Sequence, residues 1–223
     1  MTTPSTMQAP ALLNTLSAGR IQTYEAAVLH ATGTQNQLQA FDLYAWNSAI
    51  ASAFMTPIHF YEVALRNAIS FAIEQVYTDQ WPWRAQFIRS LSPNGYYSPR
   101  RDLTTCNQQP TTGKVIPELK FAFWEHMLKR NHLNRIWDPH FRRAFPHSPT
   151  NMTVLDCINT LRNNNYEIRK LRNRIAHHEP IFGLTLQQNM VNMTTAIEWI
   201  CPTTLAWLLT EEKVTTLLAT KPI

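Results

Sequence analysis

The sequence predicts an all-α fold from its composition, its hydrophobic periodicity and the positions of its prolines. The 223 residues include only 5 glycines but 14 prolines, and 44% of them are hydrophobic. This balance suits helices that begin or end at proline better than strands joined by tight turns, which favour glycine. Apolar residues also recur at helical spacing along most of the chain. We therefore expect a helical bundle with no significant sheet.

A chain of this length is long enough to bury a hydrophobic core as a single domain. Its opening residues are polar, so residues 1–15 are predicted to form a disordered or loosely held tail. One helical domain is expected over residues 16–223. Residues at about 78–116 are dense in Pro, Asn, Gln and Thr, which indicates an insertion with short helices near 84–91 and 97–106.

The first helix of this domain is expected to begin after Ser17, whose hydroxyl suits an N-cap. It carries Ile21, Tyr24 and Val28 on one face. A loop around Gly33 ends it.

Two long helices are predicted next, over residues 38–55 and 57–77. Thr56 and Pro57 separate them, because they supply an N-cap and a first-turn proline for the second helix. The second helix has an apolar stripe formed by Ile58, Tyr61, Leu65, Ile69, Ile73 and Val76.

Four further helical segments follow the insertion, at residues 117–128, 133–145, 151–179 and 184–220. Pro117 opens the first, Pro180 must stop the third, and Pro202 interrupts the last. Trp124 and Trp137 are expected in the core. The third segment aligns apolar residues along one side, namely Leu155, Ile158, Leu161, Ile168, Leu171 and Ile175. In total, seven to nine helices are expected.

Charge and cysteine usage bear on partners and location. The net charge of +5 draws the protein toward polyanions, so nucleic acid is a candidate partner. Cys106, Cys157 and Cys201 fit neither a disulfide framework nor a Cys-x-x-Cys site, which favours the reducing cytoplasm. The N-terminus lacks a signal-peptide pattern and no apolar run is long enough to span a membrane, so no membrane association is expected.

The most informative stretch is residues 171–180, which place Arg172, Asn173, Arg174, His177 and His178 within about two helical turns. Histidine exchanges protons near neutral pH, and an arginine can neutralise a phosphate. This chemistry suits cleavage of RNA, which carries its own nucleophile, the 2′-hydroxyl. Cationic groups in a last turn also stabilise the helix dipole, and this structural explanation accounts for the pattern equally well.

No metal or other cofactor is expected at this site. Glu167 and Glu179 are the only acidic residues within ten positions of His177, so a carboxylate cluster for Mg²⁺ is missing from the sequence. Arg172 and His177 would lie about 140° apart on an unbroken helix. We therefore expect a homodimer in which both protomers contribute, or unwinding of the helix before Pro180.

Glu62 falls on the apolar stripe of its helix, where an unpaired carboxylate is costly. Arg66, four residues later, can pair with it. Two interpretations remain open: a structural ion pair, or a group of Glu62, Arg66 and Asn67 that supports the site at Arg172.

The arrangement Arg172-Asn173, three residues and His177 matches the signature of the HEPN superfamily. Three further stretches occur in the expected order, at residues 43–47, 62–67 and 118–124, and the full string at 171–180 reads LRNRIAHHEP. Over most of residues 16–182 the chain resembles the Abi-like branch of this superfamily, proteins of abortive infection.

The resemblance implies a helical HEPN core with additional N-terminal and insertion helices, homodimerisation, and metal-independent RNA cleavage in phage defence or a toxin-antitoxin system. It implies that Arg172 stabilises the phosphate, Asn173 orients the histidine or the substrate, and His177 acts as general acid or base. His178 is the alternative histidine. No tyrosine follows within residues 178–184, which argues against silencing by a nucleotidyltransferase antitoxin and leaves an RNA antagonist, a protein antagonist or activation by infection.

Two other functions remain as alternatives. A non-catalytic HEPN module would bind RNA or a protein, and a metal site would use His177, His178 and Glu179, although adjacent histidines rarely chelate one ion. A set of basic and aromatic residues is a candidate for guiding single-stranded RNA, namely Arg84, Arg89, Arg100, Arg101, Arg142, Arg143, Trp81, Trp83, Tyr96 and Tyr97.

Overall fold

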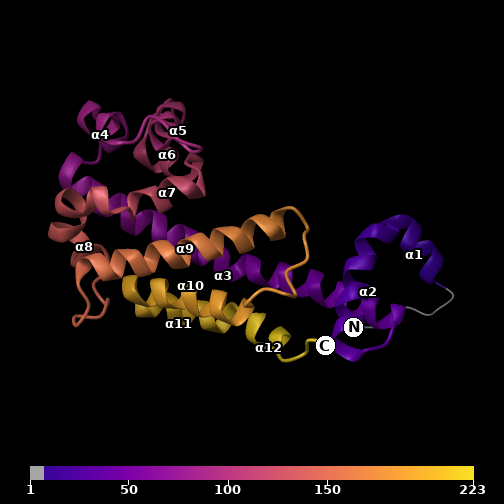
Figure 1. Cartoon of the computed structure of the whole chain (residues 1–223). Coiled ribbons are helices and arrows are strands. Elements are labelled where there is room, and N and C mark those ends of the chain that lie inside the picture. The colour runs from indigo at the N-terminus through magenta and orange to yellow at the C-terminus, as the bar shows by residue number, and fades with distance from the viewer. Residues whose placement is uncertain (1–7) are drawn as a thin grey trace. The chain divides into compact units, whose positions relative to one another are not determined.

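A computed structural model of the protein describes residues 8–223, and this range contains helices and no strand (Figure 1). The all-α prediction is therefore confirmed. Twelve α-helices lie in this range, more than the seven to nine expected, because the insertion and the C-terminal segment divide into short pieces. In chain order they are α1 (Ala9–Leu16), α2 (Ala18–Thr32), α3 (Gln37–Tyr77), α4 (Ala85–Ser90), α5 (Pro99–Cys106), α6 (Thr112–Glu118), α7 (Phe121–Met127), α8 (Asp138–Ala144), α9 (Val154–Ala176), α10 (Leu186–Ile200), α11 (Pro202–Glu211) and α12 (Val214–Leu218).

Helix α3 corrects the predicted break at Thr56. It is a single helix of 41 residues with Pro57 inside it. A proline removes one backbone donor, and the rest of the helical ladder is kept. The apolar stripe continues through this point, since Phe54, Ile58 and Pro57 are all buried, and burial offsets the cost of the missing hydrogen bond.

Two other boundaries also differ from the prediction. Pro117 lies inside α6 and does not open a helix, and the backbone is extended at Leu119 and Lys120 before α7 begins. The predicted tail contains most of α1, a short helix with Pro10 in its first turn. The rest of the predicted tail, residues 1–7, lies outside the described residues.

The contacts divide the described chain into two compact units. Unit 1 consists of residues 8–55, 173–187 and 212–223, and unit 2 consists of residues 56–172 and 188–211. Each is described by itself below. The single helical domain over residues 16–223 stays a prediction.

In unit 1, the local chemistry of α2 matches the prediction. The Ser17 hydroxyl accepts a hydrogen bond from the Arg20 amide at 3.3 Å, and the helix ends at Gly33, which has a φ of 73°. Glycine is the residue best suited to this left-handed conformation. The buried face of α2 consists of Ile21, Tyr24 and Val28.

Aromatic contacts join the separate segments of unit 1. The Tyr24 ring packs against Tyr44 of α3 and Phe182, with ring centroids 5.2 and 5.1 Å away. The Trp46 indole donates a hydrogen bond to the Leu217 carbonyl at 2.8 Å, which fastens the C-terminal segment to α3. These contacts bring the segment after α9 close to α2 and α3.

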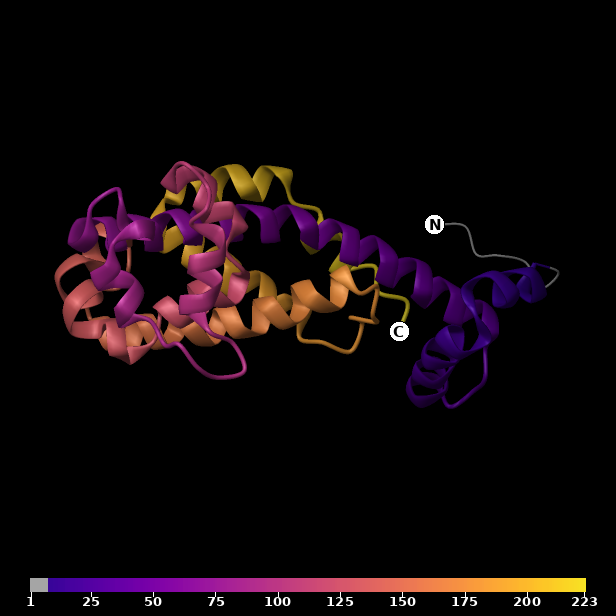
Figure 2. The same cartoon turned by 90° about the horizontal axis from the view of Figure 1, so that it is seen from above.

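In unit 2, α9 runs alongside the second half of α3 in the opposite direction (Figures 1 and 2). The Tyr61 hydroxyl donates to Asn165 Oδ1 at 3.0 Å, and both residues are fully buried. Burial raises the pKa of Tyr61 well above its usual range, with Glu62 and Glu125 adding to the effect, so the phenol stays a donor. Trp124 and Trp137 are also fully buried, as predicted.

We expect Tyr61→Phe to destabilise the protein by about 1 to 2 kcal/mol, because Asn165 Oδ1 would lose its donor in the core. The free energy of unfolding from urea titrations measures this effect. Tyr166→Phe is the matched control, since Tyr166 is exposed on α9, the helix that carries Asn165. Equal unfolding midpoints for the parent and Tyr61→Phe would contradict the assigned hydrogen bond.

Candidate functional site

The end of α9 is closed by a pair of backbone hydrogen bonds. The Glu179 amide donates to the Arg174 carbonyl at 2.8 Å, and the His178 amide donates to the Ile175 carbonyl at 3.0 Å. These two bonds form a Schellman motif, in which the residue after the cap adopts the left-handed conformation. The helix therefore ends at Ala176 by its own capping turn, and Pro180 follows this turn.

His178 occupies the left-handed position of this motif, with a φ of 54°. Glycine is usual there, and a residue with a side chain costs about 1 kcal/mol or more in this conformation. The guanidinium of Arg20 donates a hydrogen bond to the His178 carbonyl at 2.6 Å and helps to hold the turn. The chain thus places an imidazole where the backbone favours no side chain.

Asn47 fixes the segment that follows this turn. Its side-chain oxygen accepts hydrogen bonds from the amides of Ile181 at 2.7 Å and Phe182 at 3.1 Å, and the residue is 6% exposed. Asn47 belongs to one of the stretches on which the resemblance was based. Within unit 1, its physical role is to hold the chain just after the histidine pair.

A pocket of about 480 Å³ lies beside this turn in unit 1. His178 is one of its lining residues, whereas His177 is exposed and is not among them. Other residues that line it are Arg20, Tyr24, Tyr44, Asn47 and Glu179. Burial raises the pKa of Tyr24 to about 12, with Tyr44 adding to the effect and Arg20 opposing it, so this phenol can donate a hydrogen bond but cannot serve as a base near neutral pH.

In unit 2, Glu62 pairs with two arginines. It forms the expected ion pair with Arg66 on α3, and its Oε1 lies 3.5 Å from Nε of Arg172 on α9. The Glu62 side chain is 11% exposed, so the two cations compensate a largely buried carboxylate. The Arg172 side chain remains 46% exposed. Asn67 is exposed on the same helix as Glu62.

The other predicted residues lie in unit 1. Asn173 is exposed, and its carbonyl accepts a hydrogen bond from the His177 amide at 3.0 Å. Arg174 Nε lies 3.3 Å from Glu179 Oε2, so Arg174 is engaged in a local ion pair. The predicted partners Arg172 and His177 thus belong to different units.

Several basic and aromatic residues proposed as RNA guides serve the fold. Trp81 is fully buried. Arg142 donates to the carbonyls of Ser148, Pro149 and Met152, and thereby holds the loop before α9. Arg100 likewise donates to the carbonyls of Arg89 at the end of α4 and of Leu91 just after it. Neither the positive charge of the arginines nor the aromatic ring of Trp81 distinguished structural from functional roles.

The fold and this site define an all-α protein with a basic, histidine-containing turn at the end of α9. Comparisons with models of protein families, with curated proteins and with solved structures found no match to the chain. Within residues 8–223, no three His, Cys, Asp or Glu side chains are grouped as metal ligands. No helix of that range combines the length and the apolar character that crossing a bilayer requires.

We expect Asn47→Ala to lower the free energy of unfolding by about 1 to 3 kcal/mol, because the amides of Ile181 and Phe182 would lose their acceptor. Urea titration followed by circular dichroism measures this change. Asn163→Ala on the exposed face of α9 is the control and should have little effect. If the two variants were equally stable, Asn47 would not hold this segment.

Glu62→Gln is expected to destabilise the protein by about 1 to 3 kcal/mol, since two arginines would lose their counter-charge. The control is Glu167→Gln, which removes an exposed carboxylate paired with Lys170. Such exposed pairs contribute little. Thermal and urea unfolding of both variants provide the comparison, and a Glu62→Gln protein as stable as the control would rule out a compensated buried carboxylate.

Proposed function

We propose that this protein is a metal-independent RNA endonuclease that uses Arg172, Asn173 and His177. The observation that carries this proposal is the exposure of the ionisable groups at the end of α9. Arg172 keeps nearly half of its side chain exposed although Glu62 lies 3.5 Å from it, and His177 and His178 are exposed as well. Accessible guanidinium and imidazole groups can meet a polar substrate, the first through charge and the second through proton transfer.

The ion pair with Glu62 uses the Nε atom of Arg172. Among the described residues, none accepts a hydrogen bond from its two terminal amino groups, and its side chain is 46% exposed. These groups can therefore donate to the oxygens of a phosphate, whose charge grows as the nucleophile attacks. In this proposal Glu62 and Arg66 position Arg172 and do not touch the substrate.

The reaction follows from the chemistry of RNA. A neutral imidazole removes the proton from the 2′-hydroxyl, and the 2′-oxygen forms a bond to the adjacent phosphorus. The bond from phosphorus to the 5′-oxygen of the next nucleotide breaks, and this oxygen takes a proton from an acid. The products are a 2′,3′-cyclic phosphate and a 5′-hydroxyl end. Two imidazoles, from His177 in two protomers or from His177 and His178, can serve as base and acid.

We also propose that the chain is a HEPN protein that acts as a homodimer in the cytoplasm, in abortive infection or a toxin-antitoxin system. The residues of the superfamily signature support this proposal, and so do the contacts of the other matching stretches. Asn47 holds the segment after the histidines, and Glu62 pairs with the signature arginine Arg172. An RNA or protein antagonist would restrain the activity.

We expect the purified protein to cleave total RNA in EDTA and to leave 2′,3′-cyclic phosphate ends. His177→Ala and Arg172→Ala should each reduce the cleavage rate by about 10²-fold or more, because proton transfer and charge stabilisation each contribute at least this much. Gel analysis of a labelled RNA gives the rate. His59→Ala on α3 is the control, since His59 is exposed outside the proposed site.

The variant His178→Gly distinguishes the catalytic roles of His177 and His178. Glycine adopts the left-handed backbone without strain, so this substitution removes only the imidazole. Activity close to the parent's would assign catalysis to His177, and a loss like that of His177→Ala would show that both act. Cleavage by His177→Ala and Arg172→Ala at the parent's rate would make the assigned site wrong. RNA binding without cleavage by the parent would favour the non-catalytic module.

A further inference from the structure

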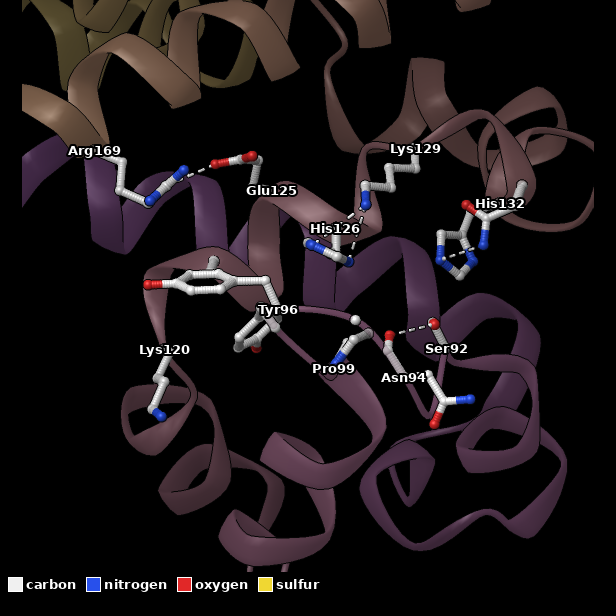
Figure 3. A pocket seen from close by; sticks show the side chains of 14 residues that line it. Ser92, Asn94, Tyr96, Pro99, Lys120, Glu125, His126, Lys129, His132 and Arg169 are labelled. Atoms are coloured by element: carbon white, nitrogen blue, oxygen red, sulfur yellow. Dashed lines mark hydrogen bonds and ion pairs between the residues drawn. The ribbon is translucent and has the colours of Figure 1, made fainter.

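A second pocket, of about 800 Å³, lies within unit 2 and was not anticipated from the sequence (Figure 3). Its walls come from the loop before α5, from α7 with its flanking residues, and from α9. The lining residues that matter here are Tyr96, Tyr97, Lys120, His126, Lys129 and Arg169. Its volume is typical of pockets that bind small molecules, and it exceeds what an inorganic anion fills.

The walls of this pocket are held by hydrogen bonds. The Tyr97 hydroxyl donates to Asp102 Oδ2 at 2.6 Å, and the same oxygen accepts from the Lys120 amide at 3.1 Å. Asp102 is 7% exposed, so this bridge ties the loop to the start of α7 in a protected environment. The Ser98 hydroxyl donates to the Ser92 carbonyl at 3.2 Å and closes the loop that carries Tyr96.

The charge that lines this pocket is positive. Glu125, a lining carboxylate, is neutralised by Arg169, with Nε 2.8 Å from Oε2. No carboxylate of residues 8–223 forms an ion pair with Lys120 or Lys129. The Lys129 ammonium lies 3.2 and 3.3 Å from the two ring nitrogens of His126. Figure 3 shows this contact on a part of the rim away from Lys120. Two lysines therefore line the pocket with no carboxylate of the described range to neutralise them, and Lys129 contacts only a neutral ring through its ammonium.

The histidines of the pocket are held neutral. Burial lowers the pKa of His126, and the Lys129 cation lowers it further. Burial lowers the pKa of His132 to about 4, with the cations of Arg135 and Lys129 contributing. A neutral imidazole can donate one hydrogen bond to an incoming group without competing for its charge.

Aromatic rings accompany these cations. Tyr96 is fully exposed at the tip of its loop, next to Gly95, which has a φ of 116°. The rings of Tyr97 and His126 lie 5.0 Å apart and line the same pocket. Rings beside lysines are the combination that binds nucleotides, because a base stacks on a ring while the phosphate meets the cations.

We propose that this pocket binds a phosphorylated nucleotide, either free or at the 5′-phosphorylated end of an RNA strand. Lys120 and Lys129, on different parts of the rim, attract the phosphate groups, and Tyr96 stacks on the base. This binding site is separate from the proposed cleavage residues and does not depend on their activity.

Isothermal titration calorimetry of the full chain tests this proposal in EDTA at low salt. The probes are the four nucleoside 5′-diphosphates and a 5′-phosphorylated tetranucleotide whose 2′-oxygens are methylated, so that it cannot be cleaved. We expect one site with a Kd tighter than about 1 mM and at least about tenfold weaker binding of adenosine and inorganic phosphate. A diphosphate that binds as tightly as the tetranucleotide identifies a free nucleotide, and tenfold tighter binding of the tetranucleotide identifies an RNA end.

Lys129→Gln and Lys120→Gln should each weaken binding at least about tenfold, and Tyr96→Ala should weaken it about fivefold or more. Lys170→Gln, which removes an exposed lysine of α9 outside the pocket, should bind like the parent. Circular dichroism and thermal melting confirm that each variant is folded. The proposal is overturned if no probe binds with a Kd below about 1 mM, or if the pocket variants bind like Lys170→Gln.

Discussion

The buried carboxylate of Glu62 is the constraint on which the arrangement of unit 2 depends. A carboxylate on the apolar stripe of α3 would be prohibitively costly without counter-charge, and the chain supplies two arginines. Arg66 comes from the next turn of the same helix, and Arg172 comes from the antiparallel helix α9. The interaction therefore joins the two long helices and fixes the direction of the one guanidinium for which a chemical role is proposed.

Local chemistry made much of the fold predictable. Ser17 and Gly33 each determine the end of a helix through a side chain or a backbone angle, and both act where the sequence predicted. Pro57 and Pro117 were misjudged because the preference of proline for helix starts is only a local tendency. At Pro57, burial of the surrounding residues outweighs the loss of one backbone hydrogen bond. Pro117 is exposed and lies one residue before the end of the short helix α6.

The candidate site was predictable only where its contacts are local. The pair of Glu62 and Arg66 follows from their spacing on one helix. By contrast, the hydrogen bonds from Arg20 to the His178 carbonyl and from the Ile181 amide to Asn47 join residues more than a hundred positions apart. No periodicity encodes such contacts. The nucleotide pocket is of the same kind, since a loop, a short helix and a long helix each contribute a wall.

The left-handed backbone at His178 gives this position an unusual mutational profile. Few amino acids adopt a φ near 54°: glycine does so at no steric cost, and asparagine, aspartate and histidine do so more often than other side chains. Selection for folding alone would thus favour glycine over histidine at this position. His177 has no positive φ, so its backbone does not favour glycine over histidine. The frequency of histidine at position 178 among natural variants of this chain would therefore measure how strongly function requires the imidazole there.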